Sequence, residues 1–205
     1  MFGDGETRSF AGGGVRHWVA LGLGVVIAGA VAGSVVAGQF DDGSQLSAAI
    51  EESDLVKVAD IPSSDGAPAK GVYVQVTRTG HLCVWESVSA TSRERGGGCN
   101  TVDDPLNGQA LSYTLSYDGG PVVTDVRTAT LFGLATPQVA RAAVVMSDQT
   151  KHDIRLRNVR IGDADYRAFG YRVRRSDLKH GIAPIAVIAL DASGAEIGRQ
   201  TTGIG

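Results

Sequence analysis

Few side chains in this sequence could carry chemistry on their own, since the chain has 2 cysteines and 4 histidines among 205 residues. Cys83 and Cys99 lie 16 positions apart. An even number of cysteines is typical of a disulfide in an oxidising compartment, and closing a loop of this size stabilises a fold by about 3 kcal/mol. A redox-active pair would be spaced as CxxC, and a zinc site would need more ligands than His81 alone. The sequence therefore predicts a structural disulfide and no metal site.

Three histidines, His81, His152 and His180, lie well beyond the N-terminal apolar tract. A hydrolase could use His81 or His152 as a general base, but no serine lies in a nucleophile-elbow pattern. Asp163 and Asp165 could each ligate Ca²⁺, but a calcium loop needs more oxygen ligands in register. We predict no catalytic residue, no cofactor and no metal. An envelope hydrolase with an unrecognised site is the alternative.

Positive charge is concentrated between Lys151 and His180, where 9 Lys and Arg stand against 4 Asp and Glu. Two strand-like runs in this segment carry arginines at alternate positions, namely Arg155, Arg157, Arg172 and Arg174. If the two runs are neighbours in a sheet, these arginines form a basic face that could bind an anionic envelope polymer, lipid headgroups or an acidic protein. The alternative is a solvated sheet face whose long side chains oppose aggregation.

The segments that would position these side chains have the period of β-strands from Gly71 onward. Two such runs, Val72–Val76 and His81–Val88, flank a turn and predict a hairpin. Further strand-like runs cover residues 111–117, 122–132, 139–146, 153–159, 166–173, 185–190 and 196–201. About eight or nine short strands predict a mainly β domain, an antiparallel β-sandwich of immunoglobulin-like or similar form. The apolar run 185–190 is typical of a central strand, and the more polar 196–200 of an edge.

Residues 18–38 form an apolar tract without a single charged side chain. As a helix, a tract of this length would span the ~30 Å apolar core of a bilayer. The sequence therefore predicts one N-terminal transmembrane helix that contacts the lipid bilayer through residues 18–38. A cleaved signal peptide is the alternative, because Val36-Ala37-Gly38 places small residues near a cleavage point, and the product would then be secreted.

The charges on either side of the tract predict its orientation. Arg8 and Arg16 precede it, whereas no Lys or Arg follows until Lys57. Cytoplasmic flanks are the more basic ones, so we expect residues 1–17 to be a short cytoplasmic tail and the C-terminal domain to be extracytoplasmic. This is the topology of a single-pass plasma-membrane protein.

Small residues repeat every fourth position within the tract, at Gly29, Gly33 and Ala37. Such spacing lines one helix face and permits close helix pairing, although a tract rich in Gly and Ala also meets it by chance. A structural or regulatory subunit of a membrane complex is therefore a further alternative.

Residues 39–70 are acidic and rich in serine, and they include Pro62 and Pro68. We predict a linker here, with a short helix around Gln45 to Glu52 and a loop over 61–70. The extracytoplasmic β-rich domain would then comprise residues 71–205.

The overall charge excludes one class of partner. The chain has 19 Lys and Arg against 22 Asp and Glu, a net charge of −3. A dedicated nucleic-acid binder usually carries a strong basic excess, so we expect no nucleic-acid partner.

The segment Gly133–Arg141 (GLATPQVAR) leads into Ala142–Met146 and the turn Ser147-Asp148, and Ala189–Gly194 (ALDASG) follows later. This succession of a Gly/Pro turn, a strand, an Asp turn and a closing hairpin resembles a segment of uncharacterised membrane-anchored envelope proteins of high-GC bacteria. The resemblance implies an anchored or exported β-domain. It implies no activity and no site residues. The predicted function is a non-enzymatic binding or interaction domain of the cell envelope.

Overall fold

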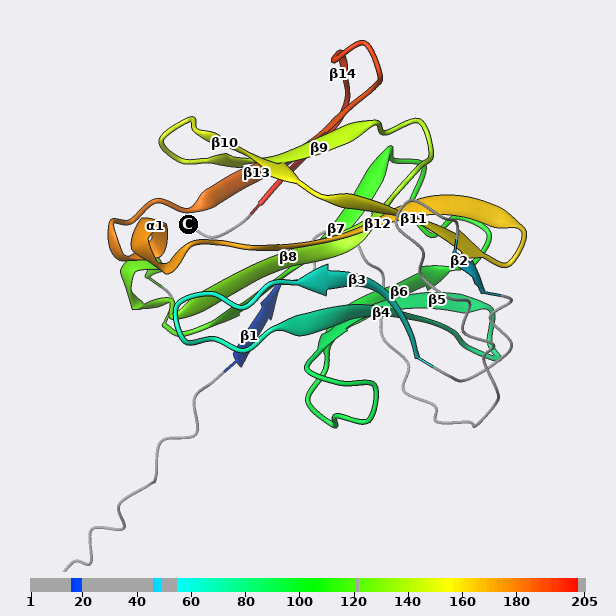
Figure 1. Ribbon diagram of the computed structural model, residues 1–205, viewed down its shortest axis with the longest axis horizontal. Coiled ribbons are helices and arrows are strands. Elements are labelled where there is room, and N and C mark those ends of the chain that lie inside the picture. The colour runs from blue at the N-terminus through cyan, green and yellow to red at the C-terminus, as the bar shows by residue number, and fades with distance from the viewer. Residues whose placement is uncertain (1–15, 20–45, 49–54, 121, 203–205) are drawn as a thin grey trace, which may run out of the picture.

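The computed structural model describes residues 16–19, 46–48, 55–120 and 122–202 (Figure 1). Most of the predicted membrane helix, residues 20–38 with the pairing face Gly29, Gly33 and Ala37, lies outside the described residues. Its first two residues belong instead to strand β1 (Arg16–Val19). Within the described ranges, no helix is long and apolar enough to cross a membrane.

The described part of the chain is mainly β, as predicted. The remaining strands are β2 (Leu46–Ala48), β3 (Val56–Ile61), β4 (Lys70–Val76), β5 (His81–Ser87), β6 (Gly96–Thr101), β7 (Leu111–Asp118), β8 (Thr128–Ala135), β9 (Arg141–Met146), β10 (Lys151–Ile154), β11 (Leu156–Ile161), β12 (Ala164–Arg172), β13 (Pro184–Leu190) and β14 (Glu196–Thr201). The described helices are short: the 3₁₀ turn η1 (Val123–Asp125) and the α-helix α1 (Arg175–Lys179).

The strands form three stacked sheets, where the sequence predicted a two-sheet sandwich (Figure 1). The central sheet has the order β1-β7-β8-β12-β11-β2, the upper sheet β10-β9-β13-β14 and the lower sheet β3-β4-β5-β6. Neighbouring strands are antiparallel in all three, except that β2 is parallel to β11. As expected, β13 is a central strand and β14 an edge strand of the upper sheet.

The central sheet is buried on both faces at β8, which explains why this strand is apolar at consecutive positions. In β8, Phe132 and Leu134 pack with residues of β3, β4 and β5 in the lower core. Their neighbours Leu131 and Ala135 pack with residues of β9 and β13 in the upper core. Successive side chains of a strand point to opposite faces, so a strand covered on both faces can be apolar at every position.

The single strand predicted over residues 153–159 is two strands that belong to different sheets. β10 pairs with β9 in the upper sheet, and β11 pairs with β12 in the central sheet. The chain changes sheets at Arg155, between Ile154 in the upper core and Val159 in the lower core. Strands commonly turn the corner between packed sheets by such a bend, and the bend leaves the alternation of apolar residues unchanged.

Regular β-structure begins before Gly71, inside the predicted linker. In β3, Val58 and Ile61 are fully buried in the lower core. A register shift between Lys57 and Ala59 interrupts the period-two pattern of this strand, which explains why its sequence did not look like one. Of the helix expected around Gln45 to Glu52, the structure describes Leu46–Ala48, and these residues form β2.

The disulfide between Cys83 and Cys99 is confirmed. The two residues are direct cross-strand partners on β5 and β6. β6 begins with three glycines, and a Cβ at Gly97 would lie 1.9 Å from the carbonyl oxygen of Val84. Only glycine allows this close approach of the two strands. Because glycine is uncommon in strands, the run of three glycines did not indicate a strand in the sequence.

Candidate anion-binding cavity

β12 has a free edge at its C-terminal end, because β11 leaves the central sheet there. Pairing with β11 stops at Phe169, whereas pairing with β8 continues to Arg172. The N–H of Val173 donates to the carbonyl oxygen of Ala129, 3.0 Å away on the β8 side. Because the residues of an antiparallel strand bond alternately to the two sides, Gly170 and Arg172 direct their backbone groups to the β11 side; Arg155 stands opposite Gly170, so the free part of the edge is at Arg172.

A cavity of about 360 Å³ lies beside this free edge. It is lined by Ala59, Asp60, Pro62, Asp153, Arg155, Arg157, Gly170, Tyr171 and Arg172. These residues come from the end of β3, from the corner between β10 and β11, and from β12. The cavity therefore lies where the edges of all three sheets meet. Its volume is within the ~300–1,000 Å³ typical of small-ligand sites.

Two arginines stand at the corner of the cavity with different surroundings. Arg155 is exposed, and its guanidinium has no hydrogen-bond or ion-pair partner among the described residues. In Arg157, Nη2 lies 3.7 Å from Oδ2 of Asp60. The other carboxylate oxygen of Asp60 lies 2.5 Å from Nζ of Lys57, so this single carboxylate is shared between two cations. Both arginines therefore retain N–H groups for a further acceptor.

Arg172 forms the inner wall of the cavity and is only 7% exposed. Its Nη2 donates to the carbonyl oxygen of Pro68 at 2.8 Å. Its Nε and Nη1 are buried without a hydrogen-bond partner in the described part of the chain. Burial lowers the pKa of Arg172, and the charge of Glu86 acts in the opposite direction. Buried donors of a charged group are costly when they stay unpaired.

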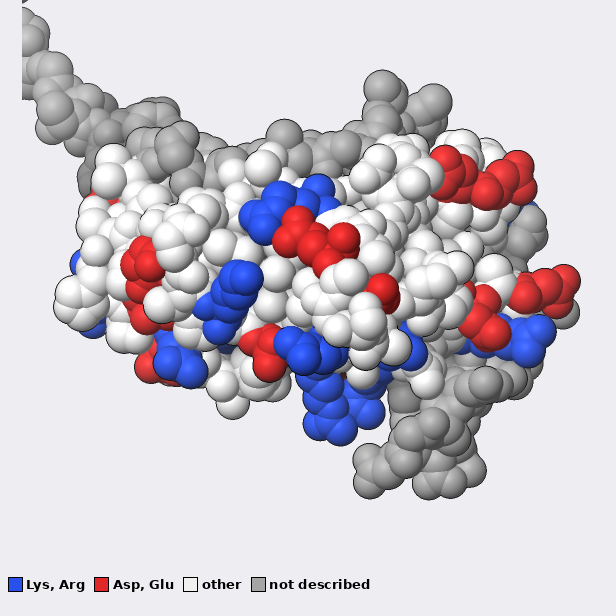
Figure 2. Space-filling model, turned by 90° about the horizontal axis from the view of Figure 1, so that it is seen from above, with Lys and Arg blue, Asp and Glu red and all other residues white. Residues whose placement is uncertain are grey.

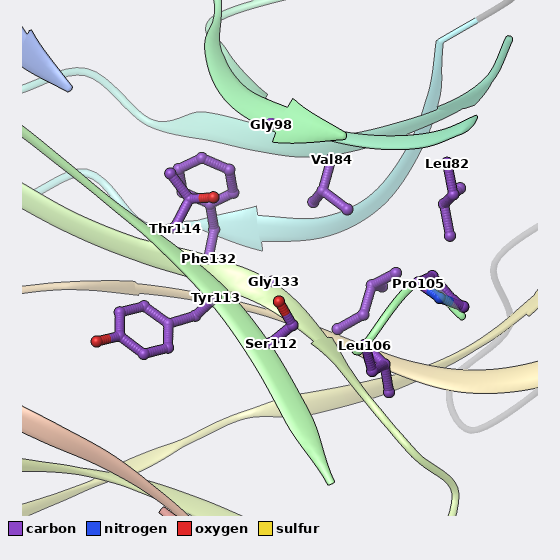
Figure 3. A pocket seen from close by; sticks show the side chains of 11 residues that line it. Leu82, Val84, Gly98, Pro105, Leu106, Ser112, Tyr113, Thr114, Phe132 and Gly133 are labelled. Carbon is purple, nitrogen blue, oxygen red and sulfur yellow. The ribbon is translucent and has the colours of Figure 1, made fainter. Parts of the chain in front are cut away.

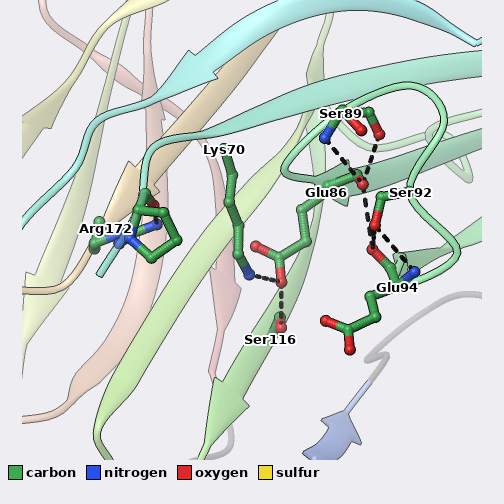
Figure 4. A network of polar contacts seen from close by, with 9 residues as sticks. Lys70, Glu86, Ser89, Ser92, Glu94, Ser116 and Arg172 are labelled. Carbon is green, nitrogen blue, oxygen red and sulfur yellow. Dashed lines mark hydrogen bonds and ion pairs between the residues drawn. The ribbon is translucent and has the colours of Figure 1, made fainter. Parts of the chain in front are cut away.

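A buried polar network lies behind Arg172, between the central and lower sheets (Figure 4). Glu86 is 2% exposed, and its Oε1 accepts from Lys70 Nζ and from Ser116 Oγ, each at 2.7 Å. Ser116, Thr130 and Arg172 occupy one register row across β7, β8 and β12. This row gives one end of the lower core a polar lining.

Tyr171 supplies an aromatic wall and a buried phenol. Burial raises the pKa of Tyr171 to about 12. The negative charge of Asp177 adds to this increase, and the positive charge of Arg174 opposes it. Its hydroxyl is buried and has no hydrogen-bond partner among the residues described. Its ring centroid lies 6.1 Å from that of His152. The phenol therefore remains neutral at physiological pH and adds no negative charge to the cavity.

Three of the four predicted arginines, Arg155, Arg157 and Arg172, meet at this cavity, whereas Arg174 is exposed and precedes α1. They do not form one solvated sheet face, because the lower sheet covers Arg172. Figure 2 shows Lys and Arg interspersed with Asp and Glu on the upper face, apart from one gathered group of basic side chains. Sequence reasoning missed Asp60 and Pro62, which it had placed in the linker.

Among the described residues, neither His81 nor His152 stands between a carboxylate and a hydroxyl. Nε2 of His152 lies 3.4 Å from Oγ1 of Thr150, and this hydroxyl also bonds Oδ1 of Asp148 at 2.7 Å. The hydroxyl thus lies between the acid and the histidine, whereas in a catalytic triad the histidine lies in the middle. His81 bonds Thr79 beside a turn. Among the described residues, no group of three or more His, Cys, Asp or Glu could hold a metal ion.

Two other hollows fit an anionic ligand less well. The first, about 20 Å³, lies between the central and lower sheets and is lined mainly by apolar groups such as Leu82, Val84 and Phe132, so it is a packing void (Figure 3). The second, about 500 Å³, lies beside β14 and contains one charged residue, Arg199. That guanidinium is already paired with Glu196 at 2.7 Å.

The cavity at Arg155 thus combines guanidinium donors and an aromatic wall. The guanidinium groups can hold a carboxylate or another oxyanion by charge-assisted hydrogen bonds. No protein-family model, no curated protein and no solved structure matches the chain.

Proposed function

We propose that this chain is a single-pass membrane-anchored protein whose extracytoplasmic β-rich domain binds an anionic ligand, and that binding occurs in the cavity at Arg155. The observation that carries the proposal is the exposed guanidinium of Arg155, which has no partner among the described residues and lines the same cavity as Arg157 and Arg172. An anionic polymer or an acidic protein of the envelope would supply an acceptor for Arg155 and would be attracted by the positive charge of Arg172.

The charges that line the cavity support this ligand class. Three arginines stand against the two carboxylates Asp60 and Asp153, which leaves one positive charge. The buried position of Arg172 reduces screening by salt, so its attraction for an anion is stronger than that of a surface arginine. We therefore expect binding to weaken with salt but to persist at physiological ionic strength.

The disulfide supports the extracytoplasmic location. Disulfides such as that between Cys83 and Cys99 persist in oxidising compartments and are rare in the cytosol. The apolar tract of residues 18–38 supplies the anchor in this proposal, and secretion after cleavage of that tract is its alternative. Both versions place the cavity outside the cell membrane.

The binding proposal can be tested by calorimetric titration of the full-length chain, in detergent micelles, with poly-L-glutamate and with acetate. Replacing Arg155 by Ala removes a charge-assisted hydrogen bond and should weaken binding roughly 10- to 100-fold. Arg160→Ala is the matched control, because Arg160 lies on β11 but does not line the cavity. Equal affinities of the unmodified chain and both variants would refute the proposal.

The location can be tested by labelling thiols on intact cells with a membrane-impermeant reagent, followed by fractionation. We expect Cys83 and Cys99 to be labelled only after reduction and to be found in the membrane fraction. Labelled protein in the medium would favour secretion. Thiols that react only after lysis, without reduction, would place the domain in the cytoplasm and contradict the proposal.

A further inference from the structure

Two side chains that line the cavity carry opposite charges and have no partner. They are Arg155 and Asp153, and neither has a hydrogen bond or an ion pair with any residue that the structure describes. The ion pairs of the described residues do not join the two to each other either. The cavity therefore offers a ligand one unpaired positive group and one unpaired negative group.

The other charged groups of the cavity already have partners. The two oxygens of Asp60 face the cations of Lys57 and Arg157. Arg172 is buried and donates to a backbone carbonyl oxygen. The choice of ligand therefore depends mainly on the two unpaired groups.

The backbone places both groups at the corner between β10 and β11. Asp153 pairs with Ala143 on β9, in the upper sheet. Arg155 follows two residues later and stands opposite Gly170 on β12, in the central sheet. Two residues of chain span at most about 7 Å, so both side chains can contact one small ligand at the same time.

A simple anion uses only half of this arrangement. Bound at Arg155, it would leave Asp153 unpaired and would be repelled by its carboxylate. A ligand that also carries an ammonium group would form a charge-assisted hydrogen bond to each side chain. In an α-amino acid the carboxylate and the ammonium group stand on one carbon, so a single small molecule supplies both.

The size and the walls of the cavity favour a small ligand of this kind. Its volume of about 360 Å³ is near the lower end of the ~300–1,000 Å³ typical of small-ligand sites. Ala59, Pro62 and Tyr171 also line it and provide apolar contacts. These contacts suit a small apolar side chain on the ligand.

We infer that the cavity binds a free α-amino acid with a small apolar side chain, whose carboxylate lies at Arg155 and whose ammonium group lies at Asp153. This inference rests on the proposed function, because the carboxylate is the anionic group that the cavity binds. It adds the ligand class and assigns a recognition role to Asp153.

The test is calorimetric titration of the full-length chain, in detergent micelles, with three matched ligands. L-alanine carries both charged groups, N-acetyl-L-alanine lacks the ammonium group and L-alanine amide lacks the carboxylate. Each missing group removes one charge-assisted hydrogen bond, so L-alanine should bind about tenfold more tightly than either analogue.

Two variants connect each charged group of the ligand to its residue. Asp153→Asn should weaken binding of L-alanine about tenfold and should not weaken binding of N-acetyl-L-alanine. Arg155→Ala should remove the advantage of L-alanine over L-alanine amide. The matched controls are Asp163→Asn and Arg160→Ala, which lie outside the cavity and should retain both preferences, with unchanged circular dichroism in all four variants.

Equal binding of L-alanine and N-acetyl-L-alanine to the unmodified chain would overturn the inference and leave the proposed function standing. An advantage of L-alanine that persists in Asp153→Asn would overturn it as well. If L-alanine, its two analogues, acetate and poly-L-glutamate all fail to bind, both proposals fall.

Discussion

Arg157 and Asp60 face each other at the cavity, with Nη2 of the guanidinium 3.7 Å from Oδ2 of the carboxylate. The pair joins β11 of the central sheet to β3 of the lower sheet. Lys57 holds the other oxygen of Asp60 at 2.5 Å. The carboxylate of Asp60 therefore partly neutralises the guanidinium of Arg157 and competes with an anionic ligand for it.

We expect Asp60→Asn to strengthen binding of acetate and poly-L-glutamate several-fold, because it frees Arg157 and removes a negative charge from the cavity. The side chain of Asp60 is 57% exposed, so the loss of its ion pairs should change the free energy of unfolding by less than about 1 kcal/mol. Calorimetric titration and urea unfolding measure the two effects. Asp163→Asn, an exposed change outside the cavity, is the control, and an equal gain in that variant would contradict the local explanation.

In the buried network, replacing Glu86 alone should destabilise the fold more than replacing Glu86 and Lys70 together. Glu86→Gln leaves the ammonium of Lys70 without its carboxylate partner and should destabilise the fold by about 3 kcal/mol. Replacing Glu86 and Lys70 together by Leu removes both charges and should cost less than Glu86→Gln alone. Urea unfolding of the variants provides the measurement. A double variant less stable than the single one would show that the ion pair itself stabilises the fold.

Two buried tyrosines should respond in opposite ways to the loss of their hydroxyls at neutral pH. Tyr113 donates to the carbonyl oxygen of Thr201 at 2.7 Å, so Tyr113→Phe should cost about 1 kcal/mol. The hydroxyl of Tyr171 has no described partner, so Tyr171→Phe should be neutral or stabilise by up to about 1 kcal/mol. Thermal unfolding at pH 7 separates the two variants, and an equal loss in both would contradict this reasoning.

The pKa of Tyr171 also predicts a loss of stability at alkaline pH. Its folded-state pKa is raised to about 12, mainly by burial, above the value of about 10 in an unfolded chain. The resulting stabilisation is complete below pH ~10 and is lost as the pH rises toward 12, because the unfolded state ionises first. Tyr171→Phe should reduce this loss between pH 10 and 12. An unchanged pH profile of unfolding in that variant would contradict the assignment.

Glycine should stabilise the fold at one position of the turn between β9 and β10. Gln149 has a φ of 69°, the left-handed conformation, which L-residues other than glycine adopt at a cost of about 1 kcal/mol. Gln149→Gly should therefore raise the free energy of unfolding by about 0.5–1 kcal/mol. Gln149→Ala is the matched control, since it shortens the side chain and retains the Cβ, and it should give no gain. Urea unfolding of the two variants decides between backbone strain and a side-chain effect.

Part of the site could be predicted from residue types alone. The run of arginines after Lys151 indicated where an anion could bind, and Arg155, Arg157 and Arg172 do meet at one cavity. The other walls could not be predicted, because Asp60 and Pro62 come from a segment that resembled a linker. The burial of Arg172 could not be predicted either. Arg172 alternates with Tyr171 and Val173, and this pattern is the same whether the face that carries Arg172 meets water or another sheet.

The sequence by itself determined the β content, the hairpin of β4 and β5, the closing pair β13 and β14, and the disulfide. These features depend on a period of two, on turn residues and on a count of cysteines, all of which are local properties of the chain. Only the tertiary structure decided that there are three layers, that the chain changes sheets at Arg155 and that β12 keeps a free edge. Those properties depend on which strands pair and where a strand leaves its neighbour, and contacts between residues far apart in the sequence settle them.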